Sequence, residues 1–404
     1  MATAKSVLIV TYGLPYPPHG GTKLRDLNTI RCLAREHSVF LLSLLWNPGE
    51  LRDVARLREY CREVDAVVMR RSLGERLAGL ASGLRAGRPL AASAFYLAAM
   101  AEKVRRIVSE HDVDLIVFEQ LYVAPYLDAL PSPRTGRTVL SLHNVAARQY
   151  RSMLRTRVGA VHKALQLPKW LLMAAMERAY AGRADHCIVV SSRDAMLLGA
   201  THPEAPRSVI ANGVDASVYR PLPEPAGGDA LVFVGRMQYA PNIDAVRHFC
   251  RRILPIVREA VPDVRLYVVG EEPSPLVTRL ADGDRVVVTG GVPDVRPYYE
   301  RSRVAIVPLR AGGGTRVKIL EAMALGRPVV STSMGCEGLD VTDGEHLLVA
   351  DTPARFAERV VELLRRPDLR ACLARNARRL VESRHDWAVV NEGLRDVYRR
   401  LLAD

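Results

Sequence analysis

The sequence predicts an α/β protein made of two successive doubly wound domains, each built on a parallel sheet. Short, near-continuous apolar runs alternate with longer segments of helical periodicity, as expected for parallel strands that are covered on both faces. A segment rich in proline and glycine, residues 209–229, interrupts this alternation, which then begins again. The chain has 404 residues, which is long for one domain and sufficient for two.

The first half of the chain contains the first series of predicted strands. Helical patterns follow several of them, as in residues 22–37 and 98–111. We expect these elements to form an N-terminal domain over residues 1–208. The predicted strands are residues 6–12, 38–44, 65–69, 114–118, 137–142 and 186–191.

The second half repeats the pattern over residues 209–386, which we expect to form the second domain. A last helical segment, residues 387–404, closes the chain. Ligands of doubly wound sheets bind beyond the carboxyl ends of the strands, so the informative residues should follow strands directly. The predicted strands here are residues 230–235, 264–270, 285–290, 303–309 and 327–332.

The composition is that of a globular protein, with 49% hydrophobic and 25% charged residues. The apolar run near the start, Val7 to Val10, is too short for a signal peptide, and no segment approaches a membrane span of roughly 18 apolar residues. The six cysteines are scattered without a CxxC pair, which argues against a disulfide framework or a structural zinc site. We therefore expect a soluble protein of the reducing cytoplasm.

The net charge of +13 favours anionic partners such as phosphorylated metabolites or anionic lipid. The alternative is a set of solvated arginines without a common partner. Nucleic acid is disfavoured as a partner, because no zinc-finger, RNP-like or basic-zipper pattern is present.

The most informative stretch is residues 310–332, RAGGGTRVKILEAMALGRPVVST. A predicted strand ends there, three glycines follow, and Thr315 is placed to cap a helix over residues 316–325. Gly326 suits the position after that helix, and Pro328 prevents its continuation. Glycines and an uncovered helix N-terminus together favour phosphate binding. The alternative is a tight strand–helix turn with surface charges.

Lys318 and Glu321 are three residues apart, so they occupy neighbouring positions on this helix. A cation near phosphate and a carboxylate that accepts hydroxyl hydrogens would suit a nucleoside diphosphate. The spacing is neither a Walker A loop nor GxGxxG.

Five motifs resemble those of the retaining GT-B glycosyltransferases of family four (glycosyl transferases group 1), in that family's order. The resemblance is strongest to the branch with the signature G-x-G-T-R-x-K-x-L-E-A-M-A, and it extends from residue 6 to about residue 350. It implies a GT-B fold, with the final helix 387–404 packing back onto the first domain. The motifs are PPHGGTKLRDLN (17–28), SLHNV (141–145), NGVD (212–215), VFVGRMQYAPNIDAV (232–246) and GGGTRVKILEAMALGRPVVST (312–332).

The resemblance assigns most site residues to the donor, a nucleotide sugar such as a UDP- or GDP-sugar. Arg236 and Lys318 would contact its diphosphate as catalytic cations, and Glu321 would hold the ribose hydroxyls. For Gly20 and Gly21 the alternative is a plain turn. For Arg236 the alternative is an arginine at the rim of a basic protein. The remaining donor-binding residues would be Gly20, Gly21, Val292 (near the base), Gly313, Gly314, Thr315 and Arg316.

His143 follows a predicted strand and resembles the family's active-site histidine, which would touch the donor sugar. Asn144 would assist it. Glu119 also follows a strand and would bind acceptor or sugar. The alternatives are a packed histidine and a carboxylate that pairs with an arginine.

Two departures from the family's pattern concern the sugar and the diphosphate. The family often has a second glutamate, separated from the Glu321 position by seven intervening residues, and this chain has Gly313 there. It also often has a lysine before the helix that follows Arg236, and the corresponding QYAPNID (238–244) has none. Lys318 would replace that charge.

The resemblance implies sugar transfer to a hydroxyl with retention, without a metal or other cofactor, in cell-envelope, exopolysaccharide or other glycoconjugate synthesis. Residues 69–96 and 148–180 mix arginines with apolar residues and are candidates for acceptor or anionic-membrane contact at the inner face of the plasma membrane. Core-facing helices are the alternative. The rival functions are a small-molecule glycosyltransferase, a sugar-nucleotide epimerase and a non-catalytic sugar-nucleotide-binding protein.

Overall fold

The computed structural model describes residues 4–18, 20–69, 73–133, 136–154 and 160–403. The chain forms two compact units. The first comprises residues 1–148, 168–211 and 391–404, and the second comprises residues 149–167 and 212–390. The predicted boundaries at 208/209 and 386/387 lie slightly earlier, and the placement of residues 149–167 with the second unit has no counterpart in the sequence pattern.

The first unit contains a parallel sheet with strand order β3-β2-β1-β4-β5-β6-β7. In this order the chain reverses direction across the sheet between β1 and β4, so these two strands mark the topological switch point. The strands are β1 Ser6–Thr11, β2 Ser38–Leu45, β3 Glu63–Val68, β4 Leu115–Glu119, β5 Arg137–Leu142, β6 His186–Val189 and β7 Arg207–Val209.

The second unit repeats this arrangement in the order β10-β9-β8-β11-β12-β13, with all neighbours parallel. Its switch point lies between β8 and β11. The strands are β8 Ala230–Val234, β9 Arg265–Val269, β10 Val286–Gly290, β11 Val304–Val307, β12 Val329–Ser331 and β13 Leu348–Val349.

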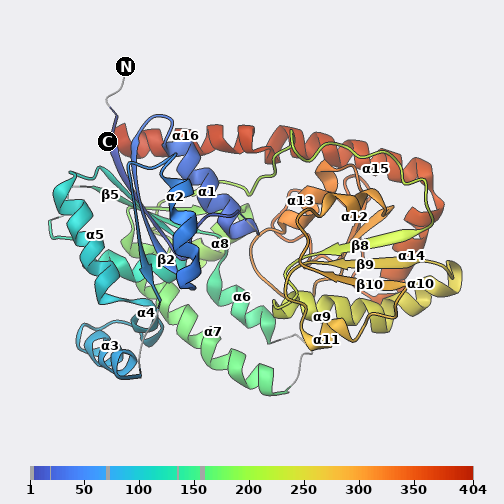
Figure 1. Ribbon diagram of the computed structural model, residues 1–404, viewed down its shortest axis with the longest axis horizontal. Coiled ribbons are helices and arrows are strands. Elements are labelled where there is room, and N and C mark those ends of the chain that lie inside the picture. The colour runs from blue at the N-terminus through green and yellow to red at the C-terminus, as the bar shows by residue number, and fades with distance from the viewer. Residues whose placement is uncertain (1–3, 19, 70–72, 134–135, 155–159, 404) are drawn as a thin grey trace. The chain divides into compact units, whose positions relative to one another are not determined.

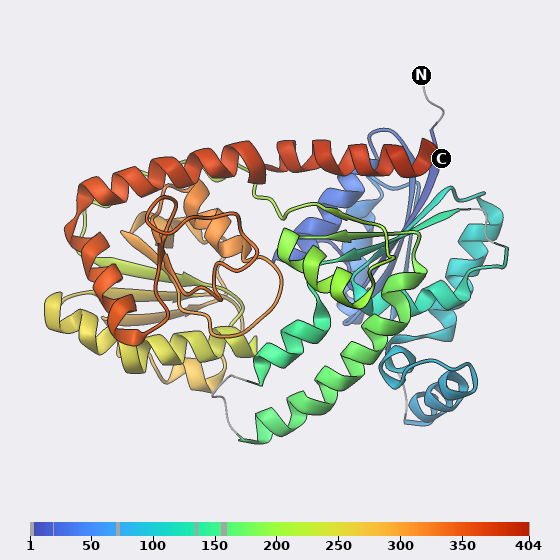
Figure 2. The same cartoon turned by 180° about the vertical axis from the view of Figure 1, so that it is seen from behind.

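Helices flank each sheet on both faces (Figures 1 and 2). None of them, within the described residues, is long and apolar enough to cross a bilayer. Their bounds are α1 Gly21–Leu33, α2 Val54–Leu57, α3 Leu73–Arg85, α4 Leu90–Phe95, α5 Ala98–Glu110, α6 Ala146–Met153, α7 Ala160–Tyr180, α8 Ser192–Thr201, α9 Ala240–His248, α10 Leu254–Ala260, α11 Pro275–Thr278, α12 Arg296–Glu300, α13 Val317–Ala324, α14 Pro353–Arg365, α15 Pro367–Leu380 and α16 Trp387–Ala403.

The prediction of two doubly wound α/β domains is confirmed, and every predicted strand forms. The central strands are buried on both sides, as their apolar runs indicated: β1 and β4, for example, are buried over nearly their whole length. The edge strands β3 and β10 are only partly buried. Two sheet-edge strands, β7 and β13, were not predicted. Each has at most three residues, too few for a periodic pattern.

Helix α13 ends as the sequence indicated, at a glycine. Gly326 has φ of 68°, a left-handed conformation that costs a residue with a Cβ free energy. Its N–H donates to the Met323 carbonyl, and the N–H of Arg327 donates to the Ala322 carbonyl. This pair of bonds is a Schellman motif, which satisfies the last carbonyls of the helix.

We predict that Gly326→Ala lowers the free energy of unfolding by about 1 kcal/mol, because alanine is strained in the left-handed region. Gly326→Asn should cost less, since asparagine tolerates this conformation. Denaturant unfolding of both variants measures the difference. Gly228→Ala is the matched control, because a Cβ at Gly228 would meet no atom within 4 Å and the residue has no positive φ. Equal losses in Gly326→Ala and Gly228→Ala would contradict the assignment.

Candidate functional site

The carboxyl ends of β8 and β11 carry the residues that the sequence singled out in the second unit. Gly235 and Arg236 follow β8, and the glycine loop follows β11. Both segments lie at the topological switch point of this sheet, where ligands of doubly wound domains bind. The sequence motifs and the topology therefore indicate the same place.

The glycine loop is held in shape by two arginines. The guanidinium of Arg310 forms a two-pronged ion pair with Asp244 of α9, with nitrogen–oxygen distances of 2.9 and 2.6 Å. The guanidinium of Arg316 turns back and donates to the carbonyls of Gly313 and Gly314. Gly314 has a φ of 65°, which favours glycine. The loop is thus fixed from both ends.

Helix α13 begins at Val317 with Arg316 as its N-cap, and no side chain caps it. Thr315 does not cap the helix as expected; its hydroxyl accepts a hydrogen bond of 2.6 Å from the Asn212 amide. The backbone N–H groups of an uncapped first turn, with the positive end of the helix dipole, favour an anion.

The Lys318 ammonium lies in the first turn of α13. It donates to the Asn242 side-chain carbonyl at 3.0 Å and lies 4.1 Å from the centre of the Phe233 ring. Burial lowers the pKa of Lys318 to about 7, and the nearby Arg316 charge acts in the same direction, while Glu321 opposes it. An anion that approaches this poorly solvated ammonium therefore stabilises its charged form.

Glu321 lies one turn further along α13 and is half-buried. The Tyr219 hydroxyl lies 3.5 Å from its carboxylate. Burial raises the pKa of Glu321 above its ordinary value, against the Lys318 charge and the Tyr219 hydrogen bond. The carboxylate is placed to accept hydrogen bonds from hydroxyl groups near the helix start.

Two further predicted residues follow other strands of the same sheet. The Arg236 side chain is exposed and has no hydrogen-bond or ion-pair partner among the described residues. Val292 follows β10 and packs partly buried against the core. Arg236 is therefore an unneutralised cation beside the loop, whereas Val292 offers mainly its backbone.

His143, in the first unit, lies directly after β5 in a buried cluster with two carboxylates. Its Nε2 lies 3.0 Å from Glu119 Oε2, at the end of β4, and 3.3 Å from Asp26 Oδ1 of α1. The Glu119 side chain is fully buried (0% exposed). The Glu119 carboxylate therefore contacts His143 inside the protein, a contact that the sequence did not suggest.

The pKa values of the three ionisable side chains in this cluster are shifted in different directions. Burial raises the pKa of Asp26 well above its ordinary value, and the Glu119 charge adds to this. Burial alone would raise the pKa of Glu119, but the His143 hydrogen bond and the Arg25 charge lower it. Burial also lowers the pKa of His143. A neutral His143 that donates from Nε2 to an ionised Glu119 leaves Nδ1 as an acceptor.

The three ligand atoms of this cluster lie within 4.8 Å of one another, close enough for one cation. The bond between His143 Nε2 and Glu119, however, uses the nitrogen that a cation would need. The buried Arg25 guanidinium, which donates to the Ile210 and Ala211 carbonyls, adds a positive charge nearby. The contact between His143 and Glu119 is therefore accounted for by a proton on Nε2.

The remaining predicted residues of the first unit lie near the carboxyl ends of β1 and β5. Gly20 has φ of 88° and is the N-cap of α1 without a side-chain cap, and Gly21 begins that helix. Asn144 is partly exposed next to His143. Gly20 and Gly21 therefore offer backbone N–H groups at a second uncapped helix start.

The two amphipathic segments expose leucines where described. Leu77 and Leu84 of α3 are 59% and 60% exposed, and Leu171 of α7 is 55% exposed. Parts of both segments (residues 70–72 and 155–159) lie outside the described residues. Helix α7 also has buried residues such as Met173 and Met176, so both the membrane-contact hypothesis and the alternative of an amphipathic core-facing helix stay open.

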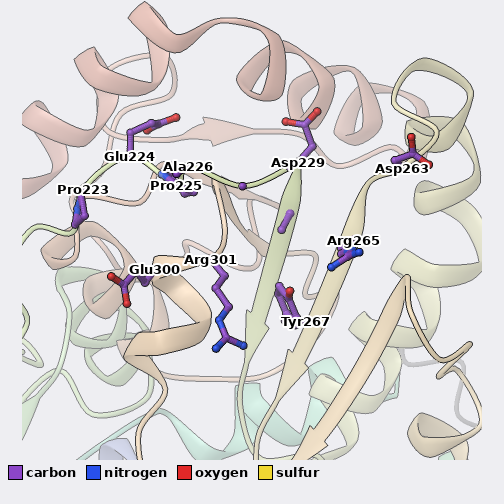
Figure 3. A pocket seen from close by; sticks show the side chains of 13 residues that line it. Pro223, Glu224, Pro225, Ala226, Asp229, Asp263, Arg265, Tyr267, Glu300 and Arg301 are labelled. Carbon is purple, nitrogen blue, oxygen red and sulfur yellow. The ribbon is translucent and has the colours of Figure 1, made fainter.

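A hollow of about 810 Å³ in the second unit lies at the opposite edge of the sheet (Figure 3). The linker 223–229 and the starts of β8 and β9 line it. Two of the carboxylates that line it are paired: Asp229 with Arg303 at 2.5 Å, and Glu224 with Arg370 at 2.9 Å. Because it lies at the amino ends of the strands, it is not the predicted ligand site.

Three residues around the site were not predicted from the sequence: Asp26, Asn242 and Tyr219. Asp26 had a detectable signal, because it is a charged residue on a face of α1 that also buries Leu27 and Ile30. Asn242 meets Lys318, and Tyr219 meets Glu321, through contacts between segments distant in sequence, which no local pattern reveals.

Two family models match the chain. The model described as Glycosyltransferase Family 4 matches residues 19–218, and the model described as Glycosyl transferases group 1 matches residues 228–366. The chain belongs to the family-four glycosyltransferases. The matches support assignment to this class of transferase enzymes.

Relatives of known name agree with this family. The chain is 32% identical over 219 residues to D-inositol 3-phosphate glycosyltransferase of Acidothermus cellulolyticus, covering 48% of each protein. It is 26% identical over 254 residues to the lipopolysaccharide core biosynthesis mannosyltransferase LpcC of Rhizobium leguminosarum, covering 58% of this chain and 68% of LpcC. Three of the curated relatives are matched over only about half of their own length (42%, 48% and 53%).

Solved structures support the GT-B fold. The sucrose-phosphate synthase of Thermosynechococcus elongatus superposes with a TM-score of 0.76 at 19% identity, over 99% of both chains. Anabaena HepE in complex with UDP-glucose gives a TM-score of 0.65 at 17% identity, over 98% of this chain and 99% of that one. The predicted fold class is thereby confirmed.

We predict that Glu119→Gln lowers the pKa of His143 further, because a neutral amide no longer stabilises the imidazolium. An NMR titration of the histidine ring protons measures this shift. His186, whose ring bonds to Ser208 at 2.9 Å and not to a carboxylate, is the internal control. An unchanged His143 titration would contradict the ionised state assigned to Glu119.

Proposed function

We propose that the protein is a retaining, metal-independent glycosyltransferase that moves a sugar from a nucleoside-diphosphate sugar to a hydroxyl acceptor. One observation carries the proposal: the poorly solvated ammonium of Lys318 lies in the uncapped first turn of α13, and Glu321 follows one turn later. Phosphate and ribose hydroxyls are the ligands that complement this sequence of groups. The UDP-glucose complex of HepE supports a nucleotide-sugar donor.

The reaction would break the bond between the sugar C1 and the β-phosphate oxygen and form a bond from C1 to the acceptor oxygen on the same face. Negative charge would grow on the leaving diphosphate. Lys318, Arg236 and the N–H groups at the start of α13 would stabilise this charge electrostatically. The leaving phosphate would take the acceptor proton, so that a separate general base is not needed.

His143 would act on the sugar. Its neutral ring, with Nε2 donating to Glu119, leaves Nδ1 to accept a hydrogen bond from a sugar hydroxyl. Glu119 would thus fix the tautomer and orientation of His143 and not bind the sugar itself. Gly313 lacks a side chain, so the loop would contact the sugar through its backbone.

The acceptor is proposed to be a cell-envelope or exopolysaccharide glycan. The relationship to LpcC, a lipopolysaccharide core mannosyltransferase by its name, supports this class. The exposed Leu77 and Leu84 of α3, which adjoin Arg76 and Arg85 in sequence, and the exposed Leu171 of α7 support peripheral contact with the inner face of the plasma membrane. A small-molecule acceptor is the second candidate, supported by the D-inositol 3-phosphate glycosyltransferase relative.

We predict that one nucleotide sugar from a panel of UDP-, GDP-, ADP- and dTDP-sugars raises the melting temperature and is slowly hydrolysed in EDTA. Arg236→Ala should reduce hydrolysis by roughly 100-fold or more, the loss expected when one transition-state stabiliser is removed. Glu321→Ala should abolish the rise in melting temperature and the hydrolysis that depends on binding, because the ribose hydroxyls lose their acceptor. Arg220→Ala is the matched control, because Arg220 donates to the Ser217 carbonyl away from the loop.

Each rival function has its own signature in this experiment. An epimerase would convert the free donor into its epimer without an acceptor, and a binding protein would be stabilised without turnover. Dependence of hydrolysis on a divalent cation would contradict metal independence. If no nucleotide sugar stabilises the protein, the proposal fails.

A further inference from the structure

Asn242 connects the two cations of the candidate donor site. It is buried in the first turn of α9, with 6% of its surface exposed. Its side-chain nitrogen donates to the Arg236 carbonyl at 2.9 Å, and its side-chain oxygen accepts from Lys318 at 3.0 Å. Because a carbonyl needs a donor and an ammonium needs an acceptor, the two partners fix the orientation of the amide.

The space around this contact is full. A Cβ added at Gly235 would lie 2.6 Å from the Lys318 nitrogen and 2.8 Å from the Asn242 side-chain nitrogen. The Phe233 ring covers another side of the ammonium. Lys318 therefore has one hydrogen-bonding side chain, Asn242, among the described residues, and little room to choose another position.

We propose that Asn242 is a positioning residue that holds the Lys318 ammonium and the Arg236 backbone in a fixed relation, ready for the two sides of a diphosphate. This inference rests on the proposed function for the identity of the ligand. The same helix α9 also carries Asp244, which forms an ion pair with Arg310 at the start of the glycine loop. Helix α9 thus contacts both segments at the switch point: the residues after β8 and the glycine loop after β11.

Asparagine suits this position better than the residues closest to it in shape. Aspartate would leave the Arg236 carbonyl without a donor and would neutralise Lys318. Leucine would fill the space but satisfy neither partner, which leaves a buried polar group unpaired. The amide supports the ammonium without consuming its charge.

The charged and titratable groups that face Lys318 belong to few elements. Arg316 and Glu321 come from α13 and its N-cap, and the Tyr299 hydroxyl of α12 lies 3.4 Å from the Lys318 carbonyl. From β8 and α9 the neighbours are the Phe233 ring and the Asn242 amide, which do not titrate. Removing the amide should therefore disfavour the ammonium and lower the pKa of Lys318, which is about 7 in the native protein.

The test measures Asn242→Leu and Asn242→Asp on the full chain, in two readouts. The first is an NMR titration of the Lys318 side chain in the protein labelled at lysine, with Lys318→Met to assign the signal. We expect Asn242→Leu to shift the titration to lower pH and Asn242→Asp to shift it to higher pH. Asn376→Leu is the matched control, because Asn376 bonds the Glu345 carbonyl on another face.

The second readout is the affinity for UDP and GDP by calorimetry at several pH values between 6 and 8.5. We expect Asn242→Leu to weaken binding roughly tenfold near neutral pH, with a larger loss as pH rises, because the amine is then uncharged. In the Lys318→Met background the same substitution should have little further effect, since the two residues act together.

The outcomes separate the inference from the proposed function. If the Lys318 titration does not move in Asn242→Leu, the positioning role is wrong whatever binds. The role is also overturned if Asn242→Leu weakens binding equally with and without Lys318, which would indicate a general structural defect. If the titration moves as expected but the wild type binds neither nucleotide, the positioning of Lys318 stands and the proposed donor fails.

Discussion

A positive charge held in a poorly solvated place is the constraint on which the candidate donor site depends. The Lys318 ammonium lies between the Phe233 ring and the Asn242 amide, at the start of a helix whose own dipole is positive there. Each of these neighbours limits hydration, and the helix end and Arg316 oppose the charge. The arrangement is costly for the free protein and favourable once a dianionic group arrives. Electrostatic preorganisation of this kind costs no rearrangement during reaction.

The two units use their switch points differently. In the second unit the groups at the carboxyl ends of β8 and β11 are cations and uncapped N–H groups, which suit an anion. In the first unit the corresponding groups after β4 and β5 are Glu119 and His143, with Asp26 beneath them. That cluster is internally paired, so it fixes a single tautomer of His143. One unit thus presents cationic groups at its switch point, and the other presents a buried histidine paired with a carboxylate.

The fold could be predicted from the sequence because the central strands are buried on both faces and show as apolar runs. The sequence also placed Lys318 and Glu321 correctly on one helix, since spacing decides which residues of a helix are neighbours. Three features depend on tertiary contacts that the sequence pattern does not show. Thr315 is not a cap because Asn212, distant in sequence, takes its hydroxyl. Glu119 contacts His143 because His143 directly follows β5, the strand that pairs with β4, and Asn242 meets Lys318 only when β8 and β11 pair.

The most direct test of the central claim is a crystal structure of the protein with a bound nucleoside diphosphate, prepared in EDTA. We expect the β-phosphate to lie within hydrogen-bond distance of the Lys318 ammonium and of the backbone N–H groups at the start of α13, with the ribose hydroxyls on Glu321. A diphosphate bound elsewhere, for instance in the hollow at the amino ends of β8 and β9, would contradict the claim. So would a phosphate held at α13 with Lys318 turned away.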